Sequence, residues 1–572
     1  MKRINIFLVS CLFVGALFTA CQKKLVEDPK SILTPSFLST PQGLQAGLDA
    51  AYAGNRMIWG PQDFFTLTVP GTDEFNSGND GNNDLVKYNS NYTTAQSNVA
   101  NIWSYCYRYI NTCNGLVDIA PTVAGLDTNT RNRTIAEAKF LRANYYFILV
   151  QFWGDVTLNE HFQTTATTSA DRSPMADVYN FIIRDLNDAI AVLPPSPVQG
   201  GVLAGKATGA AARHLLAKVY LTRAGSVAAQ TGDYQSAYNT AISLINSSAS
   251  LGLGLQQDFS KVFAEGNETN NEVLWTVQHT STLAYNGSAA QNSSGPDNLY
   301  CFLWVPQYES QPGMQRDVYY GRPYIRVVPT HWLTDTVFAE RVNDQRYSKT
   351  FQTLWLCNYA ASIPKWPNPL PAGAPAGAVS GQPKFKLGDT AIYMPGADRT
   401  DAQIAASPYL LVPPRKYNIR LAPPVTKYFD TRRSDQNAPS IRPIIVYRLA
   451  DTYLIAAEAL FMDGRAADAL PYINAIRERA AYPSGSKAAM DVTVGDLSLN
   501  FILDERSREL CGETMRWLDL VRTGQLVTRV RLHNTDGQKN IISPKHLLRP
   551  IPQVQIDGTI TGTPYPQNIG WF

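Results

Sequence analysis

Apolar residues recur at spacings of three and four in four stretches of the chain. This period places them on one face of an α-helix, so each stretch predicts an amphipathic helix. The stretches are residues 138–152, 212–220, 449–461 and 469–480. A break at Gly464 separates the last two, and residues 232–241 have the same character. The chain is therefore expected to be mostly α-helical and to contain helix pairs joined by tight turns.

Residues 250–440 interrupt the helical pattern. Pro, Gly, Asn and Tyr become more frequent there, and Pro364–Pro383 predicts a loop or linker. The alternation Val273–Val277 predicts a short strand, and residues 73–84 form a polar loop rich in Gly and Asn. A helical scaffold with long irregular loop insertions and minor short β-strands is typical of a binding protein or of an enzyme with elaborate loops. Its helix pairs are similar to tetratricopeptide units, without a regular repeat of about 34 residues.

Composition excludes two broad classes. The 572 residues are 44% hydrophobic, which provides a large core and excludes a mainly disordered chain. The formal net charge of +3 gives no reason to expect nucleic acid as a partner. Cys106 and Cys113 are seven residues apart, too far for a disulfide on one continuous helix. The cysteines and histidines show no metal-ligand spacing, so neither a metal nor another cofactor is expected.

The first 20 residues have the pattern of a secretory signal. Lys2 and Arg3 precede an apolar run that ends at Ala20-Cys21, a pattern that resembles a bacterial lipobox. We therefore expect a signal peptide over 1–20 and a lipid on Cys21 that anchors the chain to a membrane. The alternatives are an ordinary signal peptide or a single membrane anchor, for which the run is barely long enough.

Two motifs imitate catalytic sites. Residues 200–206 match the phosphate-loop pattern GxxxxGK, but Ala207 replaces the required Ser or Thr and a proline-rich segment stands where a strand should precede it. We interpret the motif as a loop that enters a helix at Thr208. Glu505, Glu509 and Glu513 form a ladder beside several arginines, which indicates surface or inter-helix ion pairs rather than an acid/base pair. Glu137 with Arg142 and Asp451 with Arg448 are interpreted in the same way, and no catalytic residues are predicted.

Aromatic residues supply the candidate binding site. Residues 285–332 contain nine aromatic residues in a stretch without helical or strand periodicity. Sugar rings stack on Tyr and Trp, and their hydroxyl groups require polar partners at the rim. A second candidate is the loop over residues 73–92. The predicted glycan-binding residues are Asn79, Asp80, Tyr88, Tyr92, Tyr300, Trp304, Tyr308, Tyr320, Arg322 and Tyr324.

Several blocks resemble one known family in the same order along the chain. They are Glu27–Lys30, Ala136–Ala143, Phe152–Val156, Arg448–Asp451 with Ile473–Arg477, Glu505–Leu510, Arg516–Leu520 and the end at Gln567–Trp571. The chain is similar in these blocks to the SusD/RagB outer-membrane lipoproteins of glycan-uptake systems. The resemblance covers nearly all of the chain after Cys21.

The resemblance implies a fold, a partner and a function. It implies one integrated fold, with an N-terminal helical region over 21–250 and a C-terminal region with loop insertions over 251–572. It also implies a lipid-anchored protein on the exterior of the outer membrane that captures oligosaccharides and delivers them to a SusC-like TonB-dependent transporter. Family members are binding proteins rather than enzymes. Two alternatives remain, namely peptide capture of the RagB type and a glycan-degrading enzyme.

Overall fold

The computed structural model describes residues 35–199, 201–282 and 297–571. The predicted signal peptide and Cys21 lie outside these ranges, and so does Tyr285. The helices of seven or more residues are α3 (Pro41–Ala53), α4 (Gln62–Thr68), α6 (Ser97–Ile119), α7 (Thr128–Trp153), α8 (Met175–Val192), α9 (Gly209–Ala224), α10 (Asp233–Ser247), α16 (Leu449–Met462), α17 (Ala466–Ala480), α19 (Leu499–Leu510), α20 (Arg516–Arg522) and α21 (Leu526–His533).

The remaining elements are short. Short helices are α2 (Pro35–Leu38), α5 (Asn83–Val86), α11 (Phe259–Val262), α13 (Tyr300–Leu303), α14 (Arg346–Thr350), α15 (Asp401–Ala406), α18 (Lys487–Met490), α22 (Gln553–Gly558) and the one-turn segment η1 (Gly54–Met57). The strands are β1 (Phe75–Ser77), β2 (Val273–Val277), β3 (Val327–Pro329), β4 (Leu354–Leu356), β5 (Thr390–Tyr393), β6 (Leu410–Leu411) and β7 (Ile444–Arg448). The prediction of a mostly helical chain with minor strands is confirmed.

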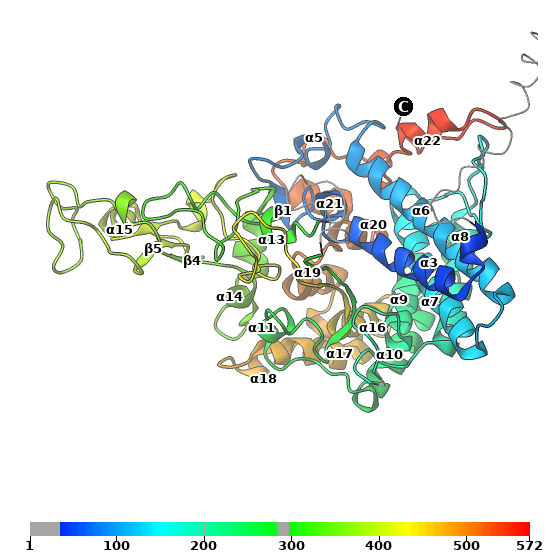
Figure 1. Ribbon diagram of the computed structural model, residues 1–572. Coiled ribbons are helices and arrows are strands. Elements are labelled where there is room, and N and C mark those ends of the chain that lie inside the picture. The colour runs from blue at the N-terminus through cyan, green and yellow to red at the C-terminus, as the bar shows by residue number, and fades with distance from the viewer. Residues whose placement is uncertain (1–34, 200, 283–296, 572) are drawn as a thin grey trace, which may run out of the picture.

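Packed helices form the body of the molecule (Figure 1). Successive helices from α6 to α10 pack against one another, and α16 and α17 extend the array through α10. Each predicted helical face lies within one of these helices, and Gly464 adopts the left-handed conformation (φ 78°) in the turn between α16 and α17. The Thr208 side chain accepts a hydrogen bond from the Ala211 backbone N–H at 3.2 Å and caps α9. Residues 201–206 are therefore the loop before this helix, as the sequence predicted.

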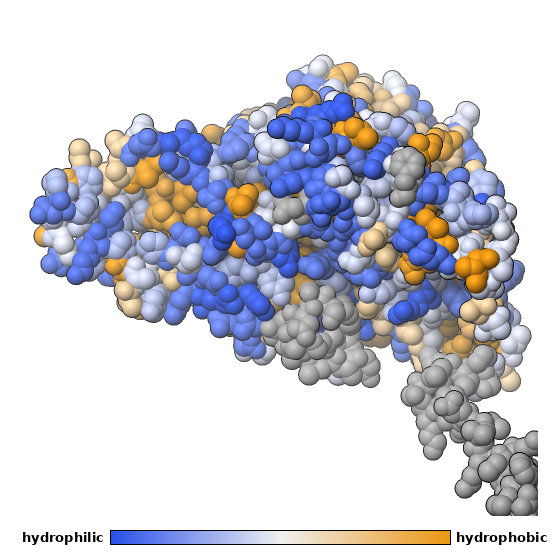
Figure 2. All heavy atoms as spheres, turned by 90° about the horizontal axis from the view of Figure 1, so that it is seen from above, coloured by the Kyte–Doolittle hydropathy of each residue, from blue (hydrophilic) through white to orange (hydrophobic). Residues whose placement is uncertain are grey.

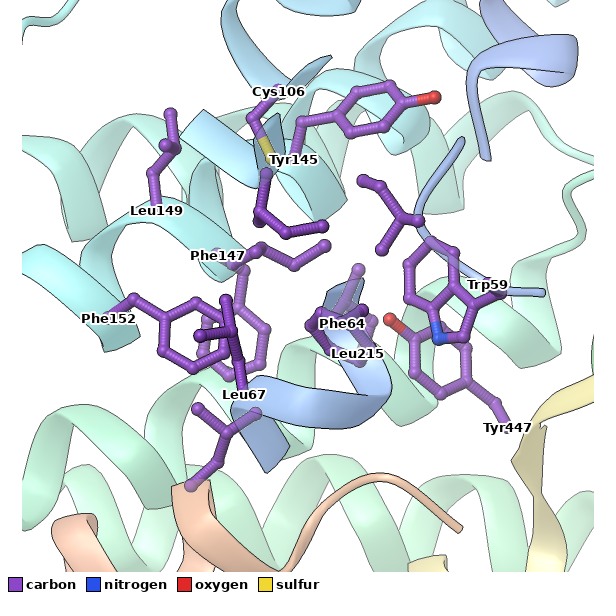
Figure 3. Close-up of a cluster of buried hydrophobic side chains, with 14 of the residues drawn as sticks. Trp59, Phe64, Leu67, Cys106, Tyr145, Phe147, Leu149, Phe152, Leu215 and Tyr447 are labelled. Atoms are coloured by element: carbon purple, nitrogen blue, oxygen red, sulfur yellow. The ribbon is translucent and has the colours of Figure 1, made fainter. Parts of the chain in front are cut away.

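One large hydrophobic core joins the N-terminal and C-terminal parts of the chain. Its buried residues extend from Leu44 to Trp571. Figure 3 shows a part of it in which Phe64 of α4 and Phe152 of α7 meet edge to face, with ring centroids 5.9 Å apart. Strand β2 adds Trp275 to this core and pairs antiparallel with β7. The boundary between the two regions at residue 250 stays a prediction.

A smaller lobe projects from the helical body and carries α15, β4 and β5 (Figure 1). It is built on the sheet β4-β5-β6 and has a core of its own, to which Tyr308, Tyr320 and Trp355 belong. The predicted loop Pro364–Pro383 contains neither a helix nor a strand. The face of the molecule seen in Figure 2 is mostly hydrophilic, with a patch of apolar side chains on this lobe.

Glu505 and Glu509 of α19, and Glu513 just beyond its end, belong to a buried ion-pair cluster. The prediction of surface pairs is therefore wrong, and that of inter-helix pairs is confirmed for the arginines of α14 and α17. Glu509 is 0% exposed and binds Arg448, Arg479 and Arg346, which come from three other elements. Burial alone would raise the pKa of Glu509, yet the three guanidinium groups hold it well below its usual range. The cluster therefore fixes α19 against β7, α17 and α14.

Two other predicted pairings have different partners in the structure. Arg142 pairs with Asp185 at 2.8 Å instead of with Glu137, which binds Arg133 at 2.9 Å. Asp451 pairs with Lys218 at 2.9 Å and with Arg506 at 2.9 Å, and it does not pair with Arg448. The structural interpretation of these residues stands, but Arg142 and Asp451 pair with residues of other elements, and Glu137 pairs with Arg133 of its own helix, α7.

The cysteines of the described ranges are free and buried. They are Cys106, Cys113, Cys301, Cys357 and Cys511. Cys106 and Cys113 both lie on α6, as their spacing required. Burial raises the pKa of the Cys106, Cys113, Cys301 and Cys511 thiols. Within the described ranges, every helix is too short or too polar to span a bilayer.

Glu74, next to β1, provides a test of a buried carboxyl group. Burial raises the pKa of Glu74 to about 7. Arg516 lies 3.4 Å away but does not cancel this shift, because it forms closer contacts with Asp73. The fold thus favours the neutral form of Glu74. The contribution of this protonated group to stability is present below the unfolded-state pKa and is lost as pH rises toward 7. Between pH 4.5 and pH 8, we expect the free energy of unfolding of Glu74→Gln to rise by roughly 2–3 kcal/mol relative to that of the parent chain, measured with urea. A difference independent of pH would contradict this assignment.

Candidate ligand-binding site

The two loops that the sequence selected lie side by side. Strand β1 pairs antiparallel with β3, and Ser77 is opposite Val327. Beyond the strands, the Gly78 N–H donates to Arg326 O at 3.0 Å and the Asp80 N–H donates to Ile325 O at 3.2 Å. Residues 78–80 and 325–326 therefore form one continuous edge, although about 245 residues separate them in the chain.

This contact depends on Gly78 and on a strained backbone at Ile325. A Cβ atom on Gly78 would lie 2.1 Å from Ile325 O, so only glycine permits the approach. Ile325 has φ 46°, a conformation that β-branched residues rarely adopt. Strain of this kind persists only where the surrounding structure enforces it, and it is common in binding sites. Here it sets the direction of the chain at Arg326.

A polar pocket of about 360 Å³ lies where this edge meets α4 and α6. Carboxylate, carboxamide, phenol and guanidinium groups form most of its wall. The lining residues are Pro61, Gln62, Asp63, Thr66, Asp80, Gly81, Asn82, Ser97, Asn98, Asn101, Tyr105 and Arg326. We call it the polar pocket.

Asp63 organises the helical side of the polar pocket. It lies in the first turn of α4, where the helix dipole favours a negative charge. One carboxylate oxygen accepts a hydrogen bond from Asn98 Nδ2 at 2.6 Å, and the other accepts one from Asn101 Nδ2 at 3.0 Å. Burial raises the pKa of Asp63, and the two amide donors oppose that shift. Asn82 Nδ2 extends the network to Asn98 Oδ1 at 3.0 Å.

Arg326 supplies the positive charge on the opposite side. Its Nε donates to Gln62 Oε1 at 3.2 Å, and its NH1 donates to Asp80 O at 2.5 Å. The guanidinium groups of Arg326 and Arg322 lie 5.1 and 5.2 Å from the centre of the Tyr324 ring. Burial lowers the pKa of Arg326. The pocket thus presents fixed hydrogen-bond donors and acceptors around one cation.

Four of the ten predicted residues belong to this region. Asp80 lines the polar pocket, and Asn79 Nδ2 donates to Asp80 Oδ1 at 2.6 Å. Arg322 and Tyr324 lie next to Arg326, and Tyr324 is 9% exposed.

The other six predicted residues are buried rings, and their expected role as stacking surfaces is corrected. They are Tyr88, Tyr92, Tyr300, Trp304, Tyr308 and Tyr320, each between 0% and 6% exposed. Trp304 shows the reason, because its ring packs edge to face on Phe65 and Phe75, at 4.8 and 5.3 Å between centroids, and stacks on Tyr428. These rings hold the irregular segments onto the body and offer no free face to a ligand.

The helical half of the polar pocket is absent from the residues predicted from the sequence. Asn98, Asn101 and Tyr105 are spaced by three and four residues on α6, so they share one face of that helix. A polar stripe at helical spacing is a signal that could have been read. Asp63 has no comparable signal, because its role depends on the contact between α4 and α6.

Comparisons with known proteins agree with this architecture. The model of the SusD family matches residues 271–571, and a second model, described as "Starch-binding associating with outer membrane", matches residues 26–221. The chain belongs to the SusD family.

Individual relatives align with most of the chain. SusD-like protein P2 of Formosa agariphila is 27% identical over 545 residues, which cover 92% of this chain and 93% of that protein. The starch-binding protein SusD of Bacteroides thetaiotaomicron is 26% identical over 423 residues, which cover 71% of this chain and 67% of that protein.

Solved structures show the same fold. A SusD homologue from Bacteroides thetaiotaomicron has a TM-score of 0.71 at 23% identity and covers 94% of this chain and 98% of its own. A laminarin-binding SusD-like protein has a TM-score of 0.65 at 23% identity and covers 93% of this chain and 100% of its own.

Proposed function

We propose that this protein captures glycan oligosaccharides in the polar pocket. The observation that carries the proposal is the set of fixed amide, carboxylate and guanidinium groups around Asp63, Asn101 and Arg326. Each sugar hydroxyl both donates and accepts hydrogen bonds, so a wall that presents both kinds of partner suits it. Two related proteins, one named as starch-binding and one as laminarin-binding, support the same ligand class.

The arrangement of Asp63 favours binding over catalysis. A glycosidase needs one carboxyl group that carries a proton to the leaving oxygen. Both oxygens of Asp63 instead accept hydrogen bonds from asparagine amides, so neither is placed to pass a proton to a leaving group. Peptide capture remains as the alternative ligand class, and the panel described below separates it from glycan capture.

The protein would act at the outer membrane. The matching family description names association with the outer membrane. We propose that lipid on Cys21 anchors the chain there, that the body faces the exterior, and that the captured oligosaccharide passes to a SusC-like TonB-dependent transporter. Palmitate labelling of the full chain and of Cys21→Ala in a Gram-negative host tests the anchor, because only the parent chain should incorporate the label. Co-purification of a barrel protein with the tagged chain tests the partner.

Loss of a polar-pocket side chain is expected to weaken glycan binding. We expect the chain from residue 22 onward to bind at least one glycan of a panel that contains α-glucan oligosaccharides, laminarin oligosaccharides and peptides, by calorimetry. Asn101→Ala and Arg326→Ala should each weaken that binding about tenfold, since each removes a preset hydrogen-bonding group.

The matched control is Asn239→Ala, which removes an exposed amide on α10, far from the polar pocket in sequence and in fold, and should leave the affinity unchanged. Binding of peptides alone would show that the protein captures peptides instead of glycans. New reducing ends after incubation would indicate an enzyme.

A further inference from the structure

A second pocket, of about 590 Å³, opens between α3, η1, the loop before α9 and the end of β2. It shares no lining residue with the polar pocket. One wall is apolar and includes Ala46, Ala50 and Val277. The loop wall contains Gly205 and Lys206 of the GxxxxGK motif. We call it the Arg56 pocket.

The lysine of the motif is already neutralised. Lys206 Nζ lies 3.5 Å from Glu137 Oε2, 3.7 Å from Asp49 Oδ1 and 4.3 Å from the centre of the Tyr52 ring. Two backbone amides at the end of the loop are also occupied, because Lys206 N donates to Leu203 O and Ala207 N donates to the Tyr52 hydroxyl. The loop therefore provides no cradle for a polyphosphate.

Among the residues that the structure describes, Arg56 is the charge in this pocket that has no counterion. Within the described residues, its Nε has no hydrogen-bond partner, and no carboxylate is among the groups that shift its pKa. Burial lowers the pKa of Arg56, and the phenols of Tyr109 and Tyr145 oppose that shift. The neighbouring Asn55 is 1% exposed, and its Oδ1 likewise has no partner among the described residues. A half-buried guanidinium without a carboxylate is costly, and an anionic ligand would remove that cost.

We propose that the Arg56 pocket is a second carbohydrate site that takes a sugar unit carrying one negative charge, either the carboxylate of a uronic acid or a sulfate ester. The anionic group pairs with the Arg56 guanidinium. At the rim, the Gln278 amide donates to and accepts from ring hydroxyls, and the Asp49 carboxylate accepts from them. The wall of Ala46, Ala50 and Val277 contacts the C–H face of the ring. A single uncompensated cation matches a singly charged unit. The assignment of a saccharide rests on the proposed function, whereas the selection for charge rests on Arg56.

Calorimetry with three matched probes tests the inference: trigalacturonic acid, 6-sulfated galactotriose and neutral galactotriose. At low salt we expect the chain from residue 22 onward to bind at least one anionic probe at least tenfold more tightly than the neutral one. Arg56→Gln should abolish this preference. Ala50→Phe, which keeps the arginine and fills the pocket, should weaken binding of the anionic probe about tenfold. High salt should weaken it as well.

The variants also separate the two sites. Asn101→Ala should leave binding of the anionic probe unchanged, and Arg56→Gln should leave binding in the polar pocket unchanged. Binding that follows Arg56 while no glycan responds to Asn101→Ala would overturn the proposed function and keep this inference. Binding of the anionic probe that neither Arg56→Gln nor Ala50→Phe weakens would overturn the inference. So would the absence of binding by every probe at millimolar concentration. Thermal unfolding of each variant confirms that it is folded.

Discussion

Glu509→Ala is expected to destabilise the folded chain by roughly 3–5 kcal/mol, measured by urea unfolding at pH 7. The Glu509 carboxylate is fully buried and lies within ion-pair distance of Arg346, Arg448 and Arg479. Its removal leaves three buried guanidinium groups with one counterion fewer. Such groups cannot turn to water, so the cost is far larger than that of a surface pair.

A surface pair and a pH series provide the controls. Glu160→Ala removes a carboxylate that lies 2.7 Å from Arg184, where both side chains are about half exposed, and should cost about 1 kcal/mol or less. The pKa of Glu509 is depressed in the fold, so its contribution is present above the unfolded-state pKa and is lost as pH falls. The difference between Glu509→Ala and the parent chain should therefore shrink below about pH 4. Equal costs for the two variants at pH 7 would contradict the role of the cluster.

Gly78→Ala is expected to weaken ligand binding in the polar pocket by tenfold or more and to cost about 1–3 kcal/mol of stability. The new methyl group would lie 2.1 Å from Ile325 O, so the two segments must separate. Separation moves Asp80 away from Arg326, whose NH1 donates to Asp80 O. The pocket then loses the geometry of its loop side while its helical side stays in place.

Gly485→Ala is the matched control for this variant. Its methyl group would lie 2.1 Å from Asn343 O, so the clash is the same but far from the polar pocket in the chain. We expect Gly485→Ala to lower stability and to leave ligand affinity unchanged, measured by calorimetry and urea unfolding. Gly558→Ala, with no heavy atom within 4 Å, should change neither. Full affinity in Gly78→Ala would show that the contact between the two loops does not position the site.

Local sequence patterns predicted the helical body because the residues that form a helix are close together in the sequence. The faces of α7, α9, α16 and α17 could be read from apolar spacing alone, and Thr208 was readable as the start of α9. The contact of the two candidate loops could not be read from any pattern. It depends on the pairing of β1 with β3, two strands of three residues each, and such short strands carry little periodicity.

Six of the seven predicted aromatic residues are almost fully buried for a physical reason. A ring in an irregular segment was taken to be free of the core because the segment shows no periodicity. Trp304 and Tyr300 are nevertheless buried, since an irregular backbone can present a ring to partners distant in sequence, such as Phe65 and Tyr428. Polar residues with short side chains, such as Asn101, line the pocket instead. Composition does not distinguish them from ordinary surface residues.

The burial of the cysteines has a practical consequence. Every thiol in the described ranges is shielded, and a chain that starts at residue 22 lacks Cys11 and Cys21. A cysteine introduced on the surface, for example in place of Val379 on the projecting lobe, would be the one that reacts readily with a maleimide dye. Fluorophores could thus be attached at chosen positions in an otherwise native background, and energy transfer between lobe and body would follow their separation as an oligosaccharide arrives.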